Sequence, residues 1–377
     1  MSDELQQIYD QTVDFVSKEV TPNGEEWEKS GKVPREILKK MGSLGMLGLR
    51  VPESHGGLGM GPLASATFSE ALGSSTFAGF DVTVLVHTDM SGQHLVNSGS
   101  DEQLSEWMPG ILSGETILSI GVTEPDAGSD VAGIRSSAVK DGDGWRINGT
   151  KTFITNAVYG DMTILGARTD PDNKYGISMF LVPSETEGFS VAKKLDKHGW
   201  LCSDTAELVL DDVWVPDSQL LGEPHRGFYA TMQNFQNERM VLVGMGVGAA
   251  QAAIDMTTAY TQERKAFGGK LFDLGAIRQR MAMNQAKVDA ARSLMYHAAW
   301  LEEQGIDNVK EMSGAKAWGC EVVNEVMYDC LQFHGGTGYM RETPIERMHR
   351  DARILTIGGG ATEVMLEEVA KRSYNDH

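Results

Sequence analysis

One long stretch without proline, Asn234 to Gly268, restricts the fold of this chain more than any other feature of its sequence. Alanine, methionine, glutamine and glutamate are frequent in it, and all four favour helix, so the stretch predicts a single long helix. Gly244, Gly246 and Gly248 each destabilise a helix by about 1 kcal/mol relative to alanine. We therefore expect them to allow close packing against a neighbouring helix. A dinucleotide loop is excluded, because no strand precedes these glycines and the G-x-G-x-x-G spacing is absent.

Charged residues stand at both ends of the predicted helix. Glu238 and Arg239 lie near its start, whereas Glu263, Arg264 and Lys265 lie near its end. At ~1.5 Å per residue the two ends are roughly 39 Å apart, so they belong to different sites. A carboxylate in the first turn and cations in the last turn both match the helix dipole. Taken by itself, the position of Glu238 favours capping over catalysis.

The composition is that of a globular protein without polyanionic partners. The 377 residues suggest two or three domains, and 41% hydrophobic with 23% charged residues is typical of a soluble protein. The net charge of −20 argues against binding to nucleic acid or to an anionic membrane. The three cysteines are too scattered for a disulfide framework or a CxxC motif, and the nine histidines form no HExxH pattern, so we expect no metal.

Targeting and membrane signals are not apparent in the sequence. The beginning of the chain, MSDELQQIYD, lacks the charged and then apolar pattern of a signal peptide. The longest nearly apolar run, Met240 to Ile254, is too short to span a bilayer. Few and scattered cysteines also suit a reducing compartment. We therefore expect a cytoplasmic protein without a membrane segment.

The spacing of apolar residues changes twice along the chain. From Glu4 to about Leu118 they recur at helical spacing, and beyond this region short segments with strand character follow one another. Closely spaced strands without helices between them indicate an antiparallel barrel or sandwich. The Asp-Gly pattern in 141–144 predicts a hairpin. The expected strands cover 144–148, 152–155, 162–167, 177–182, 189–192 and 207–215.

Helical spacing returns from Gly222 onward. Besides the long helix, further helices are expected near 276–304, near 308–333 and after Thr362, and short connections between them favour a bundle. The predicted fold class is α+β, with three domains in the order α, β, α. They are an N-terminal α-helical domain over 1–118, a middle antiparallel β domain over 119–221 and a C-terminal four-helix bundle over 222–377.

Several short motifs carry the functional information. The first, VTEPDAGSD at 122–130, offers hydroxyls and unhindered backbone N–H groups of the kind that hold a polar heterocycle or a phosphate. It is followed by NGTKTFITN at 148–156, DTAEL at 204–208, ERKAFG at 263–268 and QFHGGTGY at 332–339. In this order and at these spacings, the set resembles the acyl-CoA dehydrogenases over essentially the whole chain. The segments DKHG at 196–199 and NER at 237–239 resemble the long-chain type in particular.

The resemblance implies an enzyme that contains FAD and oxidises an acyl-CoA thioester to the trans-2-enoyl-CoA. A carboxylate removes an α-proton while a hydride leaves the β-carbon for flavin N5. Electrons then pass to electron-transferring flavoprotein. Members of the family are usually homotetramers, built as dimers of dimers.

The resemblance also implies the roles of individual residues. Residues expected beside the flavin ring are Val122, Thr123, Phe153 and Thr155, with Ser129 between the flavin and CoA parts of the site. Contacts to the diphosphate and adenosine half of a flavin from the neighbouring subunit are expected from Arg264, Phe267, Gln332, Gly335 and Gly336. Substrate contacts are expected from Ser129, Gln236, Asn237 and Arg239.

A glycine-rich segment precedes the last helix, at Gly358 to Thr362. Its amides could bind an anion at the helix start, which adds Gly360, Thr362 and Glu363 to the predicted cofactor contacts. A glycine-rich cap without a ligand is the alternative. Ala361 stands where many relatives carry threonine, and Gly275 stands where they carry glutamine. Each change removes a hydrogen bond worth about 0.5–1.5 kcal/mol, which weakens FAD binding without abolishing it.

Members of the family carry the catalytic base at one of two positions. Many family members carry the glutamate in the loop before the last helix, where this chain has Gly359. A smaller set, including the long-chain and isovaleryl-CoA dehydrogenases, carries it on the long helix directly before an arginine. Glu238 and Arg239 match that arrangement, so Glu238 is the expected base. Two alternatives remain: a flavin-dependent acyl-CoA oxidase, and a non-catalytic flavoprotein that acts as an assembly factor. The chain length and branching of the acyl group stay open.

Overall fold

The N-terminal part is helical, as predicted. The computed structural model of the chain describes residues 2–374. Ser2 caps the first helix by accepting a hydrogen bond from Leu5 N, and Ser100 and Gln103 form a capping box at the start of a later one. The helices are α1 (Asp3–Phe15), α2 (Gly24–Ser30), α3 (Arg35–Ser43), α4 (Pro62–Gly73), α5 (Ala78–Leu85), α6 (Gln93–Ser98) and α7 (Asp101–Leu112).

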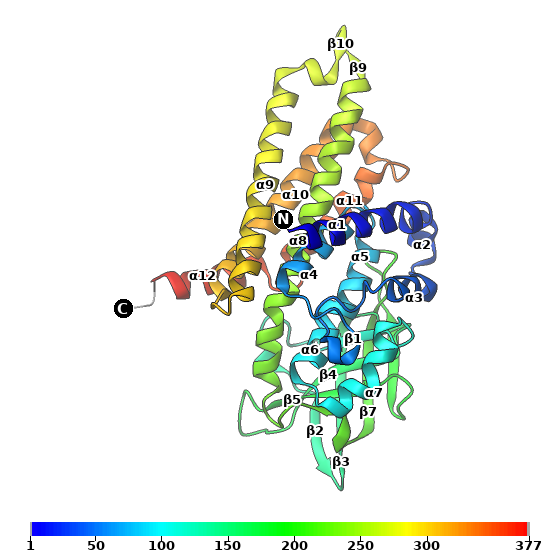
Figure 1. Cartoon of the computed structure of the whole chain (residues 1–377), viewed down its shortest axis with the longest axis vertical. Helices are drawn as coiled ribbons and strands as arrows, with labels where there is room; N and C mark the ends of the chain where they lie inside the picture. Colours follow the sequence, from blue (N-terminus) through cyan, green and yellow to red (C-terminus); the bar gives the residue numbers. More distant parts are fainter. Residues whose placement is uncertain (1, 375–377) are drawn as a thin grey trace.

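The middle part is a β domain at one end of the molecule (Figure 1). Within residues 2–374 its strands form one eight-stranded sheet in the order β6-β7-β3-β2-β4-β5-β8, with β1 added beside β4. The predicted hairpin joins β2 to β3, where Asp141 pairs with Gly144 and Gly142 has a φ of 61°. The strands are β1 (Leu118–Gly121), β2 (Ser137–Asp141), β3 (Gly144–Thr155), β4 (Met162–Arg168), β5 (Ile177–Pro183), β6 (Phe189–Lys194), β7 (Thr205–Pro216) and β8 (Leu220–Leu221).

The sheet differs from the expectation in three respects. β1 and β2 pair with β4 in parallel, whereas the other pairs are antiparallel. The two segments predicted at 144–148 and 152–155 belong to the single strand β3, which stays paired with β7 through two irregularities in register. No ranges were predicted for β1 and β8, because strands this short carry little periodic signal and are defined by the partner they pair with. β2 was expected only as the first arm of the hairpin at 141–144.

The C-terminal part contains three long helices packed side by side (Figure 1). They are α8 (Gly227–Glu263), α9 (Gly275–Glu303) and α10 (Val309–His334), followed by α11 (Pro344–Ala352) and α12 (Thr362–Tyr374). A small hairpin, β9 (Lys265–Ala266) and β10 (Gly269–Lys270), joins α8 to α9. α12 packs on α10 and projects to the side in Figure 1. α11 was not predicted as a helix.

The long helix α8 begins and ends earlier than predicted. It starts at Gly227, so Glu238 lies in the helix interior and not in the first turn. The dipole and capping explanation of Glu238 is therefore wrong, because that effect is confined to the first and last turns. α8 ends at Glu263, and Phe267 and Gly268 have φ angles of 52° and 81°, which end the helical path in the hairpin.

The glycines of α8 lie where α4 crosses it. A Cβ atom added at Gly244 would lie 2.0 Å from Ser69 Oγ, and one at Gly248 would lie 2.0 Å from Glu70 O. Both distances are far below van der Waals contact, so the prediction of close helix packing is confirmed for these two positions. By length and composition α8 could also cross a membrane, but 67% of its most apolar window is buried inside the protein.

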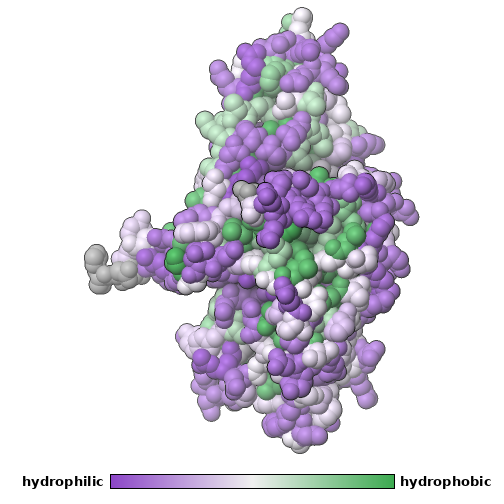
Figure 2. All heavy atoms as spheres, in the orientation of Figure 1, coloured by the Kyte–Doolittle hydropathy of each residue, from purple (hydrophilic) through white to green (hydrophobic). Residues whose placement is uncertain are grey.

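Two hydrophobic cores meet along α8. Phe228, Met232 and Phe235 pack against the core beneath the sheet, which contains Val122. From Met240 onward the helix belongs to the core shared by the N-terminal helices and the C-terminal bundle. Glu238 lies between these two cores. The surface is largely hydrophilic over α1 and the free end of the sheet, and apolar atoms gather between them (Figure 2).

A buried histidine links α7, β1 and the segment after α5. His87 Nε2 lies 3.0 Å from Ile111 O, and Leu118 N donates to His87 Nδ1 at 3.1 Å, which requires the neutral ring with its proton on Nε2. Burial lowers the pKa of His87 to about 4. Between pH 6.5 and 4 the unfolded chain therefore binds a proton that the folded chain does not, so His87 lowers stability as the pH falls through this window.

We expect the acid sensitivity of the protein to be smaller in His87→Gln. For one such group the free energy of unfolding falls by about 2 kcal/mol between pH 7 and pH 5, at about 1.4 kcal/mol per pH unit below 6.5. Melting temperatures of both proteins at these two pH values measure the difference, with His225→Gln, an exposed position, as the matched control. Equal losses in wild type and His87→Gln would contradict this account.

Candidate active site

Glu238 lies against the loop that joins α11 to α12. A Cβ atom added at Gly359 would lie 3.2 Å from Glu238 Oε1 and 3.7 Å from its Cγ. Gly359 has a φ of 62°, and Gly360 follows with a φ of 103°, so the backbone turns sharply beside the carboxylate. A side chain at position 359 and the side chain of Glu238 would therefore enter the same space from two sides.

The environment of Glu238 adjusts its ionisation in two directions. Burial raises the pKa of this carboxyl, and the positive charges of Arg239 and Lys316 lower it, with a raised pKa as the net result. A general base is most effective when its pKa is close to the working pH. The half-buried Glu238 is therefore better suited to accept a proton near neutral pH than an exposed glutamate.

Arg239 and Gln236 carry unused hydrogen-bonding capacity next to Glu238 in the chain. The Arg239 side chain is buried, and neither its Nε nor Gln236 Oε1 has a hydrogen-bond partner in the described structure. Burial lowers the pKa of Arg239, whereas Glu238 and Glu368 raise it. Buried polar groups normally have partners, so both atoms are suited to contact a bound molecule.

The side chain of Asn237 is hydrogen-bonded within the protein. Its side-chain amide donates to Asp89 O at 2.8 Å, and its Oδ1 accepts a hydrogen bond from Arg50 Nη1 at 2.5 Å. The residue is buried and connects α8 to the N-terminal part of the chain. Neighbouring residues on a helix point about 100° apart, which separates Asn237 from Glu238. In this structure the Asn237 side chain connects these two parts of the chain, and its contact with the substrate stays a prediction. Ser129 lies exposed in the 122–130 loop.

The predicted flavin-ring residues lie on β3 near its C-terminal end and on the segment hydrogen-bonded to it. Thr152 N donates to Thr123 O at 3.0 Å, which joins the Val122–Thr123 segment to β3. Phe153 occupies the irregularity in β3, has a φ of 60° and exposes 68% of its surface. Holding a non-glycine residue in this conformation costs about 1–3 kcal/mol, and such strain gathers at binding sites. Thr155 follows, half-buried. An exposed aromatic ring beside threonine hydroxyls fits a flat polar ring system.

A buried ion pair links β3 to the 122–124 segment. Lys151 Nζ donates to Glu124 Oε1 at 2.7 Å and to Val122 O at 3.2 Å. Glu124 also accepts hydrogen bonds from Arg135 N and Ser136 N. Burial lowers the pKa of Lys151 to about 8. No role was predicted for Glu124 or Lys151, although both lie inside functional motifs of the sequence, which was a usable signal.

The predicted diphosphate and adenosine contacts lie at the opposite end of α8. Arg264 is the C-cap of this helix, and Phe267, 91% exposed, lies in the hairpin at the far tip of the bundle (Figure 1). Tyr260 stacks on His334 at a centroid distance of 4.3 Å and donates to its carbonyl. This contact brings the segment of Gln332, Gly335 and Gly336 to the same end, where open space surrounds both glycines.

The remaining predicted cofactor contacts stand at the start of α12. Thr362 Oγ1 donates to Glu321 Oε1 at 2.8 Å, and Glu363 is exposed in the first turn. Gly360 O accepts a hydrogen bond from Lys316 Nζ. The hydroxyl of Thr362 is therefore in use within the protein, and Gly360 takes part through its backbone.

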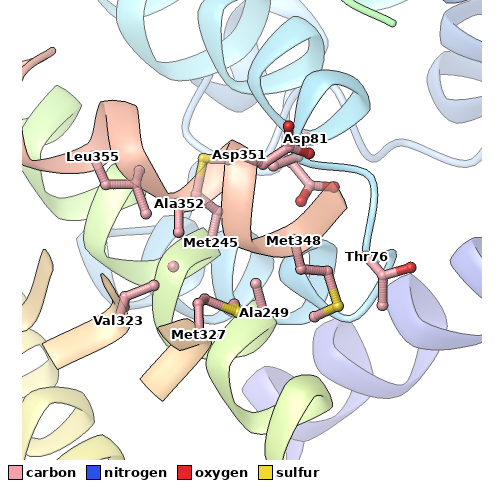
Figure 3. Close-up of a pocket in the computed structure, with 12 residues that line it drawn as sticks. Thr76, Asp81, Met245, Ala249, Val323, Met327, Met348, Asp351, Ala352 and Leu355 are labelled. Carbon is pink, nitrogen blue, oxygen red and sulfur yellow. The ribbon is translucent and has the colours of Figure 1, made fainter. Parts of the chain in front are cut away.

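A small cavity lies further along the same face of α8 as Glu238, beside Met245 and Gly246 (Figure 3). Its free volume of about 20 Å³ admits one water and no acyl chain. Asp81 and Asp351 line it, and each has one carboxylate oxygen without a partner in the described structure. Burial raises the pKa of Asp351 to about 7 and that of Asp81 well above its usual range. The cavity in this form is a small, mostly apolar void between the N-terminal helices and the C-terminal bundle, and not a substrate pocket.

Two sets of predicted residues therefore lie far apart in one chain. Phe153 is on β3, in the domain at the lower end of Figure 1, whereas Arg264 and Phe267 lie at the β9–β10 hairpin, at the upper tip. Unbroken helix from Glu238 to Glu263 gives a separation of roughly 39 Å between Glu238 and Arg264 at 1.5 Å per residue. Each set alone fits one half of a long dinucleotide, the ring half beside the C-terminal end of β3 and the phosphate half at the tip of the bundle.

Comparison with known proteins identifies the family. The N-terminal, middle and C-terminal domain models of acyl-CoA dehydrogenase match residues 2–115, 119–213 and 225–374. The mitochondrial long-chain specific acyl-CoA dehydrogenase of Sus scrofa is 39% identical over 96% of this chain and 84% of its own length.

Solved structures agree with this match. A chain in the electron transferring flavoprotein structure from Acidaminococcus fermentans has a TM-score of 0.97 and 32% identity, covering 100% of this chain and 99% of that one. A glutaryl-CoA dehydrogenase from Mycobacterium smegmatis, in complex with FADH2, has a TM-score of 0.94 and 29% identity, covering 100% and 96%. The predicted family, fold class and FAD requirement are thereby confirmed. From the three domain matches and these relatives, it follows that the chain belongs to the acyl-CoA dehydrogenase family and is an FAD-dependent oxidoreductase.

Proposed function

We propose that this protein oxidises an acyl-CoA thioester to the trans-2-enoyl-CoA, with Glu238 as the base that removes the α-proton. The observation that carries the proposal is the 3.2 Å distance between Glu238 Oε1 and the Cβ position of Gly359. Family members carry the base at either of these two positions, and in this chain only Glu238 has a carboxylate to offer. The raised pKa of Glu238 supports the same role.

The residues of the chain divide the reaction between them. Bound FAD supplies the acceptor for the hydride that leaves the β-carbon. Glu238 takes the α-proton on its carboxylate, and the electron pair of the broken α-C–H bond forms the new double bond. Arg239 and Lys316 favour the ionised carboxylate before the reaction, and burial favours its protonation afterwards. Phe153 with Thr123 and Thr155 would hold the ring system of FAD.

The separation of the two residue sets supports a cofactor shared between subunits. Arg264, Phe267 and the Gln332–Gly336 segment would bind the phosphate and adenosine half of a flavin whose ring lies on another copy. We propose a homotetramer, a dimer of dimers, in which such sharing occurs. Large apolar side chains on the outside of the bundle support association: Leu294, Trp300, Trp318 and Tyr328 each expose at least 40% of their surface.

Electron-transferring flavoprotein is the proposed acceptor, and the cytoplasm is the proposed location. The similarity to the chain from the Acidaminococcus fermentans structure supports the acceptor. The three cysteines are buried and unpaired, which is compatible with a reducing compartment. Molecular oxygen is the competing acceptor, and release of peroxide under air during turnover separates an oxidase from a dehydrogenase.

The function is tested by mixing purified protein with a panel of acyl-CoA thioesters without oxygen. We expect bleaching of the flavin absorbance by at least one straight or branched thioester, with the trans-2-enoyl-CoA as the product identified by mass and by its ultraviolet band. Matched non-thioester carboxylates serve as the control. A protein that binds FAD and bleaches with no thioester would contradict the proposal.

Arg264→Ala should lose FAD and loosen the oligomer together. A guanidinium that donates to a phosphate makes a charge-assisted hydrogen bond, and removing it costs about 1.5–3 kcal/mol, which is roughly 10- to 150-fold in affinity. Flavin content by absorbance and mass by light scattering measure the two effects. Lys270→Ala removes an exposed cation from the same hairpin and is the matched control. Full flavin occupancy in a stable monomer of Arg264→Ala would defeat the shared-cofactor account.

A further inference from the structure

A lysine with no solvent exposure lies behind the loop that faces Glu238. Lys316, in the first half of α10, is 0% exposed. Its ammonium donates to Leu355 O at 2.5 Å, to Gly358 O at 2.8 Å and to Gly360 O at 2.6 Å. An ammonium has three N–H donors, so all of its hydrogen-bonding capacity is spent on this short length of backbone.

The loop from Ile357 to Ala361 has little else to keep its shape. At its beginning, Ile357 N and Gly358 N donate to Ile354 O, and at its end Ala361 O accepts a hydrogen bond from Met365 N. Gly359 and Gly360 both have positive φ angles. Glycine adopts positive and negative φ about equally readily, so these two residues do not fix the loop conformation by themselves. The carbonyls on both sides of Gly359 are the ones that Lys316 binds. Lys316 thus restricts the part of the loop around Gly359, whose Cβ position lies 3.2 Å from Glu238 Oε1.

We propose that Lys316 is a positioning residue for the reaction of Glu238: its ammonium holds the Gly358–Gly360 backbone against the carboxylate and presents a positive charge behind it. The proposal rests on the proposed function for its catalytic consequence. Its structural half, the attachment of the loop, does not depend on the chemistry.

The charge of Lys316 has a directional effect on the pH dependence. It lowers the pKa of Glu238, so its removal should raise that pKa. Glu238 must be ionised to accept a proton, so the rate rises with pH through this pKa, and the rising limb should move to higher pH. Other titratable groups around the pair contribute to the same balance and stay constant in the experiment: Arg239 on α8, Cys320 and Glu321 on α10, and Glu368 and Arg372 on α12.

Three substitutions separate the two effects of Lys316. Lys316→Met removes both the donors and the charge, Lys316→Gln keeps two donors and removes the charge, and Lys316→Arg keeps both. Lys310→Gln removes an exposed lysine from the first turn of the same helix and is the matched control. The holoenzyme of each variant is prepared with FAD, and Lys316→Gln and Lys316→Arg decide the question if Lys316→Met does not fold.

Two measurements are made on each variant. Hydrogen exchange of the Ile357–Ala361 amides should be at least tenfold faster in Lys316→Met than in wild type, and close to wild type in Lys316→Arg. The rising limb of single-turnover flavin bleaching against pH should move up by about one unit in Lys316→Gln and stay in place in Lys316→Arg and Lys310→Gln. If the Lys316 side chain only filled space, its replacement would not speed hydrogen exchange specifically in this loop, and it would not move the rising limb of the pH profile.

The outcomes distinguish this inference from the proposed function. A limb in Lys316→Gln that coincides with that of wild type overturns the role of the charge, and unchanged loop exchange in Lys316→Met overturns the attachment. If Lys316→Met does not fold, equal loop exchange in Lys316→Gln and wild type, together with an unmoved limb, overturns the proposal. Failure of the proposed function would appear elsewhere, as full turnover in Glu238→Gln, while the exchange measurement would still test Lys316.

Discussion

Glu238→Gln should retain FAD and bind acyl-CoA but lose about 10²- to 10⁴-fold or more in turnover. A glutamine has nearly the shape of the glutamate and no capacity to accept a proton, so the loss reports general-base catalysis, whose usual contribution has this size. The amide also removes the negative charge that faces Arg239 and Lys316. Rapid anaerobic mixing with the best thioester of the panel measures the rate of flavin reduction directly.

The control for this prediction lies on the same helix. Asp255 is an exposed carboxylate on α8 that accepts a hydrogen bond from Gln251. Asp255→Asn should react at the wild-type rate. Both substitutions replace a carboxylate on α8 by the corresponding amide. The comparison therefore separates loss of the base from a general disturbance of α8. Substantial turnover by purified Glu238→Gln would remove Glu238 from the role of base.

Moving the carboxylate to position 359 should restore part of the activity lost on removal of Glu238. The Cβ position at Gly359 is 3.2 Å from Glu238 Oε1, so a glutamate there reaches the same space once Glu238 is replaced by glycine. The same Cβ would lie only 2.2 Å from Leu242 Cδ1. We therefore expect Glu238→Gly with Gly359→Glu to recover little, and the triple variant with Leu242→Ala to recover more.

The recovery should be partial even in the triple variant. A non-glycine residue with the φ of 62° seen at Gly359 is strained by about 1–2 kcal/mol. Misplacement of a reacting group by about 1 Å can reduce the rate about 10²-fold, so recovery should also vary with acyl length. The matched control is Glu238→Gly with Leu242→Ala, which has the same space and no carboxylate.

The comparison is made on protein that retains FAD and the oligomer size of wild type. In such protein, activity of the triple variant no higher than that of its matched control, across straight and branched thioesters, would show that the two backbone positions do not converge on one reacting atom. Restored activity in the double variant without Leu242→Ala would show instead that Leu242 moves aside easily, and it would support the same convergence.

The order of helical, strand and helical regions could be predicted from the sequence, because amphipathic periodicity is a local property. The hairpin at 141–144 and the close packing of α8 at Gly244 and Gly248 were predictable for a similar reason. A turn needs only its own residues, and glycine in a helix is destabilising unless a neighbour approaches. The family and the cofactor followed from motifs that lie each within one short segment.

The tertiary structure alone decided where the functional groups stand. α8 begins at Gly227 and not near Asn234. Its first helical turns carry no helix signal in the sequence, and they are stabilised because Phe228, Met232 and Phe235 pack on the core beneath the sheet. That shift moves Glu238 from a helix end to the helix interior.

Buried charges were the least predictable part of the site. Lys151 and Lys316 look like ordinary surface lysines in the sequence, yet both are almost fully buried, because their partners come from segments that are distant along the chain. The contact of Glu238 with Gly359 has the same origin. Composition and periodicity determine which elements form. Only the packing of those elements determines which polar groups are buried and which of them become partners. The pKa of Glu238 depends on both, because burial raises it and the nearby charges of Arg239 and Lys316 lower it.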